Sequence, residues 1–487
     1  MNIESNLTTK KILIHPSFRI KSGGNSFDFS AISSRVMQFQ KILFERKISK
    51  GDYAAVLSEN NLEFIVSILA LWQIEAIPVL INTRLTKAEI ENQIVFCKIV
   101  LTSSSQKKIF SEFSKPCLEI ILSSELPVKK KDEQFNLSHP AVIIFTSGST
   151  SKPKAVELSF NSLYQSFKSA DQILHQSEDD KWLASLPFYH IGGFSIFTRA
   201  LFAGCTLILP DDLSVESIGT SIQEEKPSLL SLVSPQLKEF VDKKISPNPE
   251  LRIVLIGGGR IDTDLIASAI TLGWNIHKVY GSTETASFIS ILTPAEFKFK
   301  SGSAGKPIPP NVIIIGDESG KKLPANTSGE ITVKGETLFN RYLFDSEATS
   351  QKLSNGVYYS GDVGYLDEDG YLFIKGRRSD LIVSGGENIN PAEVEAAIKI
   401  FPGIKEVCVF PINDKKWGQR TIAAIVPYEN IRIDFEKMKS NLREYIADYK
   451  IPKEFHIFDS LPKSSLGKVL RKKIIQMYMS KNEGDLF

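Results

Sequence analysis

Short apolar runs alternate with segments of helical periodicity from about residue 30 to residue 300. Strands of four to six residues are predicted by compact apolar runs, and helices by longer runs with a polar face or a capping residue. Repeated strand–helix–strand order is typical of parallel sheets covered by helices. The predicted elements are strands at 53–57, 76–81, 252–256 and 276–279 and helices at 64–72 and 262–272.

The hydrophobic pattern changes after residue 300. Short strands at 312–315, 330–333 and 371–374 are separated by acidic, glycine-containing turns, which predicts a small β-rich subdomain. A hinge is predicted at 376–380. Asn390, Pro391 and Glu393 then have the order of an N-cap, a first helical position and a third helical position. Beyond the hinge we therefore expect a compact α+β domain.

These patterns together predict an α/β protein of two domains. The large N-terminal domain covers residues 1–378 and contains helix-covered mixed or parallel sheets, with its β-rich subdomain at about 301–378. The small, mobile C-terminal α+β domain covers 379–487. A length of 487 residues supports this division, because one hydrophobic core rarely serves a chain so long.

Composition narrows the class of protein. Apolar residues make up 42% and charged residues 23%, and the net charge of +2 gives no reason to expect a nucleic-acid partner. The apolar stretch 62–81 is broken by Glu63, Gln73, Glu75 and Pro78, and its continuous part is about half of the ~20 residues that a membrane span needs.

Cysteine usage bears on the compartment. The four cysteines have no short spacing, which disfavours a disulfide framework or a zinc site and favours a reducing compartment. No signal segment or peroxisomal address is evident. We expect a cytoplasmic enzyme that acts on small molecules. The sequence does not decide whether it forms a homodimer.

The densest chemical signal is a polar run between two apolar strands, at 141–145 and 155–158. Hydroxyl side chains crowd around one glycine, and two lysines follow, in an arrangement suited to binding phosphate. The loop of nucleotide hydrolases is excluded, because that motif needs a glycine directly before its lysine; a solvated turn remains open. The candidate phosphate-binding residues are Thr146, Ser147, Gly148, Ser149, Thr150, Lys152 and Lys154.

Two further polar runs follow predicted strands. One is 257–259, three consecutive glycines, and the other is 280–285, Tyr-Gly-Ser-Thr-Glu-Thr. In parallel sheets, ligands bind beyond the carboxyl ends of the strands. A nucleotide is therefore expected at both runs.

In this order along the chain, these motifs resemble the adenylate-forming superfamily of acyl- and aryl-CoA ligases, peptide-synthetase adenylation domains and luciferases. The resemblance also uses 358–362, 384–387 and 462–468 and covers about residues 29–472. The phosphate loop departs from the usual family form, which has glycine at the positions of Ser151 and Ala155. This departure affects the conformational cost of the loop but leaves its hydroxyls and lysines in place.

The resemblance implies a role for each motif residue. Gly258, Gly259 and Tyr280 would enclose adenine, with Gly281, Ser282 and Thr283 beside them. Asp362 would accept hydrogen bonds from the ribose hydroxyls, with Arg377 close by. Glu284 would hold Mg²⁺ beside the phosphates of ATP, since that ion prefers carboxylate and phosphate oxygens. Lys468 would be the mobile catalytic lysine, and Thr150 and His190 would assist.

The resemblance also implies a two-step reaction with ATP, Mg²⁺ and CoA. A substrate carboxylate attacks the α-phosphorus and releases pyrophosphate, and a thiol then attacks the mixed anhydride and expels AMP. Between the steps the C-terminal domain would rotate about Ser379. Lys468 would leave, and the loop containing Gly385 and Gly386 would approach to line the CoA channel.

The resemblance implies that the run 187–193, Pro-Phe-Tyr-His-Ile-Gly-Gly, lines the pocket for the acid substrate. Phe188, Tyr189, His190 and Phe194 are expected to line the acid pocket. Within the superfamily, 180–183, 186–193, 302–307, 377–395 and 414–418 most resemble the o-succinylbenzoate–CoA ligases of menaquinone biosynthesis. A fatty or aryl acyl-CoA ligase and a catalytically inactive nucleotide-binding regulator remain alternatives.

Overall fold

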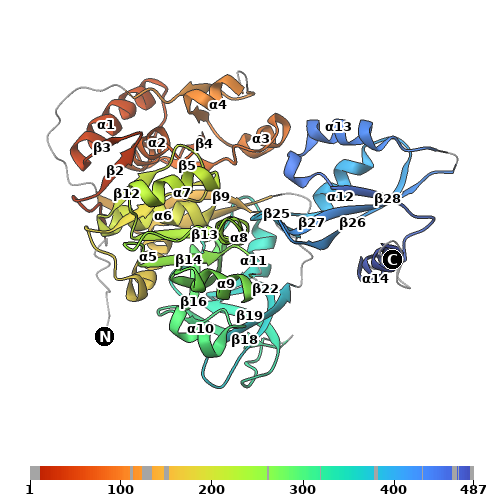
Figure 1. Ribbon diagram of the computed structural model, residues 1–487. Helices are drawn as coiled ribbons and strands as arrows, with labels where there is room; N and C mark the ends of the chain where they lie inside the picture. The colour runs from red at the N-terminus through yellow and green to blue at the C-terminus, as the bar shows by residue number, and fades with distance from the viewer. Residues whose placement is uncertain are drawn as a thin grey trace, which may run out of the picture.

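The structure, a computed structural model, describes most of the chain. The described residues are 11–109, 113–122, 134–146, 153–259, 261, 263–317, 320–377, 382–429, 431–462, 469 and 471–482. They form a large assembly of sheets and helices and a separate lobe, which contains the C-terminal elements and is blue in Figure 1. None of their helices is long and apolar enough to cross a membrane.

The first large sheet contains seven strands among the described residues, in the order β20-β10-β9-β5-β4-β6-β7. β4, β5, β6, β7 and β9 pair in parallel, and β10 runs antiparallel between β9 and β20. The strands are β4 (Tyr53–Leu57), β5 (Ile77–Leu80), β6 (Ile99–Thr102), β7 (Cys117–Glu119), β9 (Pro140–Thr146), β10 (Lys154–Ser159) and β20 (Arg341–Tyr342).

The second large sheet contains nine strands in the described residues, in the order β17-β16-β15-β14-β13-β11-β12-β2-β3. Its centre is parallel, and β16 runs antiparallel between β15 and the edge strand β17. The strands are β2 (Arg19–Ser22), β3 (Asn25–Phe27), β11 (Lys181–Leu183), β12 (Thr206–Leu209), β13 (Leu229–Val233), β14 (Ile253–Gly257), β15 (Ile276–Ser282), β16 (Ser287–Leu292) and β17 (Lys306–Pro307). β1 (Lys11–Leu13) pairs separately with β8 (Gln134–Asn136).

Helices of the large assembly begin at recognisable caps. Asn61 accepts a hydrogen bond from the backbone N–H of Phe64 at 2.8 Å, and Thr86 and Glu89 form a capping box. The helices are α1 (Phe29–Glu45), α2 (Leu62–Gln73), α3 (Lys87–Ile94), α4 (Ser104–Ile109), α5 (Phe160–Leu174), α6 (Ile191–Ala203), α7 (Val215–Glu224), α8 (Ser234–Asp242), α9 (Thr263–Thr271) and α10 (Pro294–Lys300), with a 3-10 turn, η1, at Thr283–Thr285.

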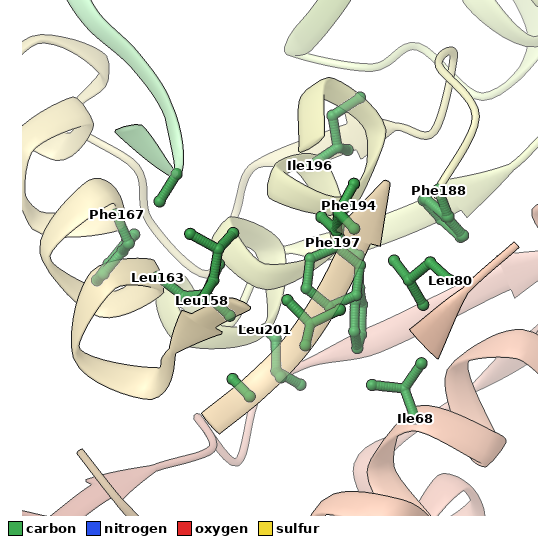
Figure 2. Close-up of a cluster of buried hydrophobic side chains, with 14 of the residues drawn as sticks. Ile68, Leu80, Leu158, Leu163, Phe167, Phe188, Phe194, Ile196, Phe197 and Leu201 are labelled. Carbon is green, nitrogen blue, oxygen red and sulfur yellow. The ribbon is translucent and has the colours of Figure 1, made fainter. Parts of the chain in front are cut away.

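The largest core lies where α2, α5 and α6 meet the sheets. Trp72 stacks on Phe197 with ring centroids 6.0 Å apart, and its indole N–H donates to the Ala141 carbonyl at 2.7 Å. Phe64 packs against Phe188 and Phe194 at 5.0 and 6.5 Å. Figure 2 shows Phe188, Phe194 and Phe197 converging with aliphatic side chains from neighbouring elements. This core fixes the segment that joins β11 to α6.

A third sheet is built from later residues. Among the described residues its order is β18-β19-β22-β21, and β23 also pairs with β22. The elements are β18 (Val312–Gly316), β19 (Gly329–Lys334), β21 (Leu353–Ser354), β22 (Val357–Leu366), β23 (Leu372–Arg377) and the short helix α11 (Ser346–Lys352). The β-rich texture predicted from the sequence is therefore present.

The C-terminal lobe is an α+β unit whose sheet has the order β25-β24-β27-β26, with β28 beside β27. Its elements are β24 (Ile382–Ser384), β25 (Glu387–Ile389), α12 (Pro391–Lys399), β26 (Ile404–Asp414), β27 (Gly418–Pro427), α13 (Phe435–Tyr445), the 3-10 turn η2 (Asp448–Lys450), β28 (Glu454–Ile457) and α14 (Arg471–Asn482). The predicted boundary at 378–379 lies outside the described residues.

Candidate active site

The predicted phosphate loop joins two antiparallel strands. Thr146 ends β9 and lies opposite Lys154, which begins β10. Residues 147–152 lie outside the described residues, so Ser147, Gly148, Ser149, Thr150 and Lys152 stay predictions. The Lys154 ammonium lies 4.8 Å from the centre of the Tyr342 ring. The strand–loop–strand pattern thus places one predicted phosphate-binding lysine beside a tyrosine that the sequence analysis did not name.

That tyrosine connects the loop to the predicted metal ligand. The Tyr342 hydroxyl donates a hydrogen bond to Glu284 Oε1 at 2.9 Å, and both side chains are buried. Burial and the neighbouring Glu284 charge raise the pKa of Tyr342 far above its ordinary value, so the hydroxyl stays a donor. Glu284 sits in η1, at the end of β15, with Thr283 before it.

The chemistry of Glu284 fits Mg²⁺ bound through a nucleotide. The described residues contain no group of three or more His, Cys, Asp or Glu able to hold a metal ion. Mg²⁺ commonly uses one or two carboxylates together with substrate phosphates rather than an all-protein cage. One oxygen of Glu284 is oriented by Tyr342, and the other has no recorded protein partner among the described residues.

The predicted ribose-binding carboxylate lies next to the predicted adenine-binding tyrosine. The Tyr280 hydroxyl donates to Asp362 Oδ2 at 2.8 Å, although the two residues are distant in sequence. Ser360 Oγ accepts from the Asp362 backbone N–H at 3.0 Å, and Arg377 is the ladder partner of Asp362 on β23. Gly281, which follows Tyr280, lies so close to β16 that a Cβ there would stand 2.1 Å from the Ser287 carbonyl oxygen.

The glycine run after β14 faces the C-terminal lobe. Gly258 has φ +83°, which favours glycine, and a Cβ at Gly259 would stand 3.0 Å from Val383 Cγ1. In the C-terminal lobe, Gly386 also has φ +83°, and a Cβ added there would stand 3.3 Å from Val233 Cγ2. The loop predicted to approach in the second half-reaction therefore lies against the predicted adenine-binding run.

The next residue of that loop contacts the predicted acid pocket. A Glu387 oxygen lies 3.0 Å from His190 Nε2, and its other oxygen accepts from Arg84 Nη1 at 3.1 Å. Burial opposes the charged carboxylate, but His190 and Arg84 outweigh it and lower the pKa of Glu387. The Gly385 position is covered by Trp417, whose ring would lie 2.8 Å from a Cβ there.

The four predicted acid-pocket residues fall into two groups. His190 is partly exposed at the N-cap of α6, and Tyr189 is 7% exposed next to it. Phe188 and Phe194 are fully buried in the aromatic core of Figure 2, behind the N-terminus of α6. Tyr189 and His190 thus face the site in this structure, and the two phenylalanines support them from the core.

One buried cation on α6 was not identified from the sequence. Arg199 is 2% exposed and makes long contacts, 3.3 Å to Ser195 Oγ and 3.5 Å to Ser166 Oγ. Its guanidinium also lies 4.4 Å from the Phe288 ring centre, and its Nε has no hydrogen-bond partner. Burial lowers the pKa of Arg199 to about 9. Its sequence signal was a lone arginine within an otherwise uncharged, mostly apolar helix.

Helix-covered sheets joined to a small C-terminal lobe, with hydrogen bonds among the predicted nucleotide-binding residues, are expected of a nucleotide-using enzyme. The family model described as "AMP-binding enzyme" matches residues 10–343, and the model "AMP-binding enzyme C-terminal domain" matches 393–468. The chain belongs to the AMP-binding enzyme family.

Two relatives of similar length are both 2-succinylbenzoate–CoA ligases. The chain is 33% identical over 467 residues to the 2-succinylbenzoate–CoA ligase of Bacillus cytotoxicus, covering 95% of this chain and 96% of the relative. It is 32% identical over 487 residues to the enzyme of that name from Geobacillus sp. (strain WCH70), covering 99% and 97%.

Solved structures of o-succinylbenzoate CoA synthetase from Bacillus subtilis reveal a difference in arrangement. A double mutant bound with the product analogue OSB-NCoA has a TM-score of 0.87 at 30% identity and covers 94% of this chain and 95% of its own. The complex of that synthetase with ATP and magnesium has a TM-score of 0.71 at 30% identity, covering 95% and 97%. At similar identity and coverage, this chain therefore superposes more closely on the OSB-NCoA complex than on the complex with ATP and magnesium.

Proposed function

We propose that this protein is an AMP-forming acid–CoA ligase that converts 2-succinylbenzoate, ATP and CoA into 2-succinylbenzoyl-CoA, AMP and pyrophosphate. The choice of 2-succinylbenzoate as the substrate is supported by full-length similarity to 2-succinylbenzoate–CoA ligases. The reaction would serve menaquinone biosynthesis. The proposal includes a cytoplasmic location, which the four free cysteines favour because thiols stay reduced there. It also allows the enzyme to form a homodimer.

In the first step, an oxygen of the succinyl carboxylate forms a bond to the α-phosphorus while the bond to the bridging oxygen of pyrophosphate breaks. No general base is needed, because the carboxylate is already ionised near neutral pH. Asp362 and Tyr280 would hold the nucleoside, and Glu284 would hold Mg²⁺ against the phosphates. Bound Mg²⁺ supplies neutralisation of phosphate charge. Lys468, which lies outside the described residues, would place its positive charge between the substrate carboxylate and the α-phosphate.

In the second step, the CoA sulfur attacks the acyl carbon, the acyl–oxygen bond to AMP breaks, and the thiol proton goes to solvent. The described arrangement suits this step, because the loop at Gly385 and Gly386 already lies at the site. The contact of Glu387 with His190 fixes that loop against the start of α6. When the C-terminal domain rotates, this loop would move away from the site, and Lys468 would take its place for the first step.

The buried Arg199 favours a substrate that has a second carboxylate besides the one that reacts. A buried guanidinium without a carboxylate partner among the described residues is costly unless an anion pairs with it. The benzoate carboxylate must be bound without reacting, and Arg199 lies on the helix that His190 caps. We therefore assign the benzoate carboxylate to the Arg199 side of the pocket.

A panel of acids tests the proposal. Purified protein with ATP, Mg²⁺ and CoA is given 2-succinylbenzoate, 3-benzoylpropionate, benzoate, succinate or octanoate, and AMP, pyrophosphate and thioester are quantified. We expect the highest kcat/KM with 2-succinylbenzoate and a large loss with 3-benzoylpropionate, which lacks only the ring carboxylate. Preference for octanoate or benzoate would establish a fatty or aryl acyl-CoA ligase instead. Absence of AMP with every acid would indicate an inactive regulator.

A further inference from the structure

Lys352 is a partly buried lysine beside the candidate nucleotide site, and none of the motifs accounts for it. It is the last residue of α11, and its ammonium nitrogen lies 2.9 Å from where a Cβ on residue 361 would stand. Residue 361 is glycine with φ +81°, so the backbone is open there and the ammonium lies directly over it. The next residue is Asp362, the predicted ribose ligand.

Four charged groups on elements of the candidate nucleotide site influence the Lys352 ammonium. They are Glu330 from β19, Glu284 from η1, Lys154 from β10 and Asp362 from β22. Glu330 is itself engaged, since its Oε1 accepts from the Gly361 backbone N–H at 3.1 Å. The ammonium lies next to the residue that precedes the predicted ribose carboxylate, and its helix accepts a hydrogen bond, through Thr349, from the backbone of Tyr342, the residue that contacts Glu284 and Lys154.

Lys352 differs from the paired lysines of this protein. Lys300 and Lys450 each hold two carboxylates, at distances of 2.7 and 2.8 Å. Lys352 belongs to no recorded ion pair among the described residues, although three carboxylates act on it. Burial is the main influence on its ammonium and lowers its pKa. A desolvated, unpaired cation beside a second cation, Lys154, is the arrangement expected where a polyanion binds.

We propose that Lys352 contacts the phosphate chain of ATP, opposite Lys154, and so serves as a further nucleotide-binding residue. This inference rests on the proposed function, because it assumes that ATP binds between Asp362 and Glu284. Lys352 would supply fixed positive charge from the N-terminal domain in both half-reactions, whereas Lys468 would supply it only in the first. The repulsion between Lys352 and Lys154 would be relieved once phosphate oxygens lie between them.

Nucleotide binding without turnover tests the proposal. Affinities for ATP and for adenosine are measured by titration calorimetry and competition, with Mg²⁺ and without acid, for wild type, Lys352→Gln and Lys352→Arg. The matched control is Lys334→Gln, an exposed lysine in β19 of the same sheet. We expect Lys352→Gln to weaken ATP about tenfold to a hundredfold, the range for one charge-assisted contact. Adenosine affinity should stay unchanged, and Lys352→Arg should retain most ATP affinity.

Thermal unfolding without nucleotide separates this role from a structural one. A lysine that stabilises its surroundings would lower the unfolding temperature when replaced. An unpaired buried cation should leave it unchanged or raise it. Equal weakening of ATP and adenosine, unchanged ATP affinity, or a lowered unfolding temperature in Lys352→Gln would overturn the proposal. If wild type failed to bind ATP, the proposed function itself would fall.

Discussion

Replacement of Glu89 by glutamine is expected to separate the two half-reactions. Lys450, in the C-terminal lobe, is 6% exposed and donates to Glu89 Oε1 of α3 at 2.7 Å and to Glu393 Oε1 of α12 at 2.8 Å. Burial disfavours the ammonium, but the two carboxylates outweigh it and raise the pKa of Lys450. This buried triad thus joins α3 of the large assembly to the lobe in the arrangement that presents the glycine loop.

The magnitude follows from the geometry. At such contact distances the attraction of one charge pair is roughly 6 kcal/mol with an effective dielectric near 20, before desolvation is counted. Loss of one partner of a buried pair costs about 3–5 kcal/mol. Because Lys450 keeps its second carboxylate, Glu393, we expect a smaller loss of about 2–3 kcal/mol. That energy shifts the population of this arrangement by about 30- to 150-fold.

The assay measures each half-reaction alone. Thioester formation from pre-made 2-succinylbenzoyl-adenylate and CoA should slow in Glu89→Gln, because the required arrangement is less populated. ATP–pyrophosphate exchange should be unchanged or faster. Glutamine preserves the capping box with Thr86, so α3 should remain folded. The control is Glu91→Gln, on the same helix, whose carboxylate accepts from Ser114 instead. An unchanged thioester rate, or an equal loss in both half-reactions, would refute the reasoning.

Three further predictions concern the site itself. Arg199→Met should raise the KM for 2-succinylbenzoate by about tenfold to a hundredfold in the exchange assay and leave the KM for 3-benzoylpropionate unchanged, since only the former has a ring carboxylate. Tyr342→Phe should raise the Mg²⁺ concentration needed for half-maximal exchange severalfold, because Glu284 loses its orienting hydrogen bond. Glu387 has a pKa below its ordinary 4.5, so its contact with His190 contributes stability above pH 4.5 and loses it as pH falls through the lower folded-state pKa. The difference in unfolding free energy between wild type and Glu387→Gln should therefore shrink below pH 4.5.

Much of the fold was predictable because each element depends on local pattern. The predicted strand 53–57 is confirmed without change, and the predicted helix 64–72 is extended to 62–73 by the cap at Asn61. The β-rich sheet and the helix after Asn390 were also predicted correctly. Pairing of β10 with β20 could not be predicted, since strand order depends on contacts between distant segments.

The site was only partly predictable from motifs. Motif order implied that Tyr280 and Asp362 share a site, and the structure joins them by a hydrogen bond. The expectation that Phe188 and Phe194 line the acid pocket stays a prediction. In the structure Phe194 and Phe197 pack in the core, while His190 stands at the start of the helix and is partly exposed. Which aromatic rings an acid reaches depends on packing between distant elements, which adjacency in sequence alone does not determine.

The residues that sequence reasoning missed share one physical property. Arg199 and Lys352 are basic, desolvated, and outside every recorded ion pair with a carboxylate among the described residues. Such groups reduce the stability of the free protein, and a bound anion compensates by charge pairing. One lies on the acid-pocket helix and the other beside the nucleotide carboxylates, so each matches a different anion of the proposed reaction. Because a ligand that pairs with an unpaired buried charge stabilises the folded state, 2-succinylbenzoate and ATP should each raise the unfolding temperature through a different residue.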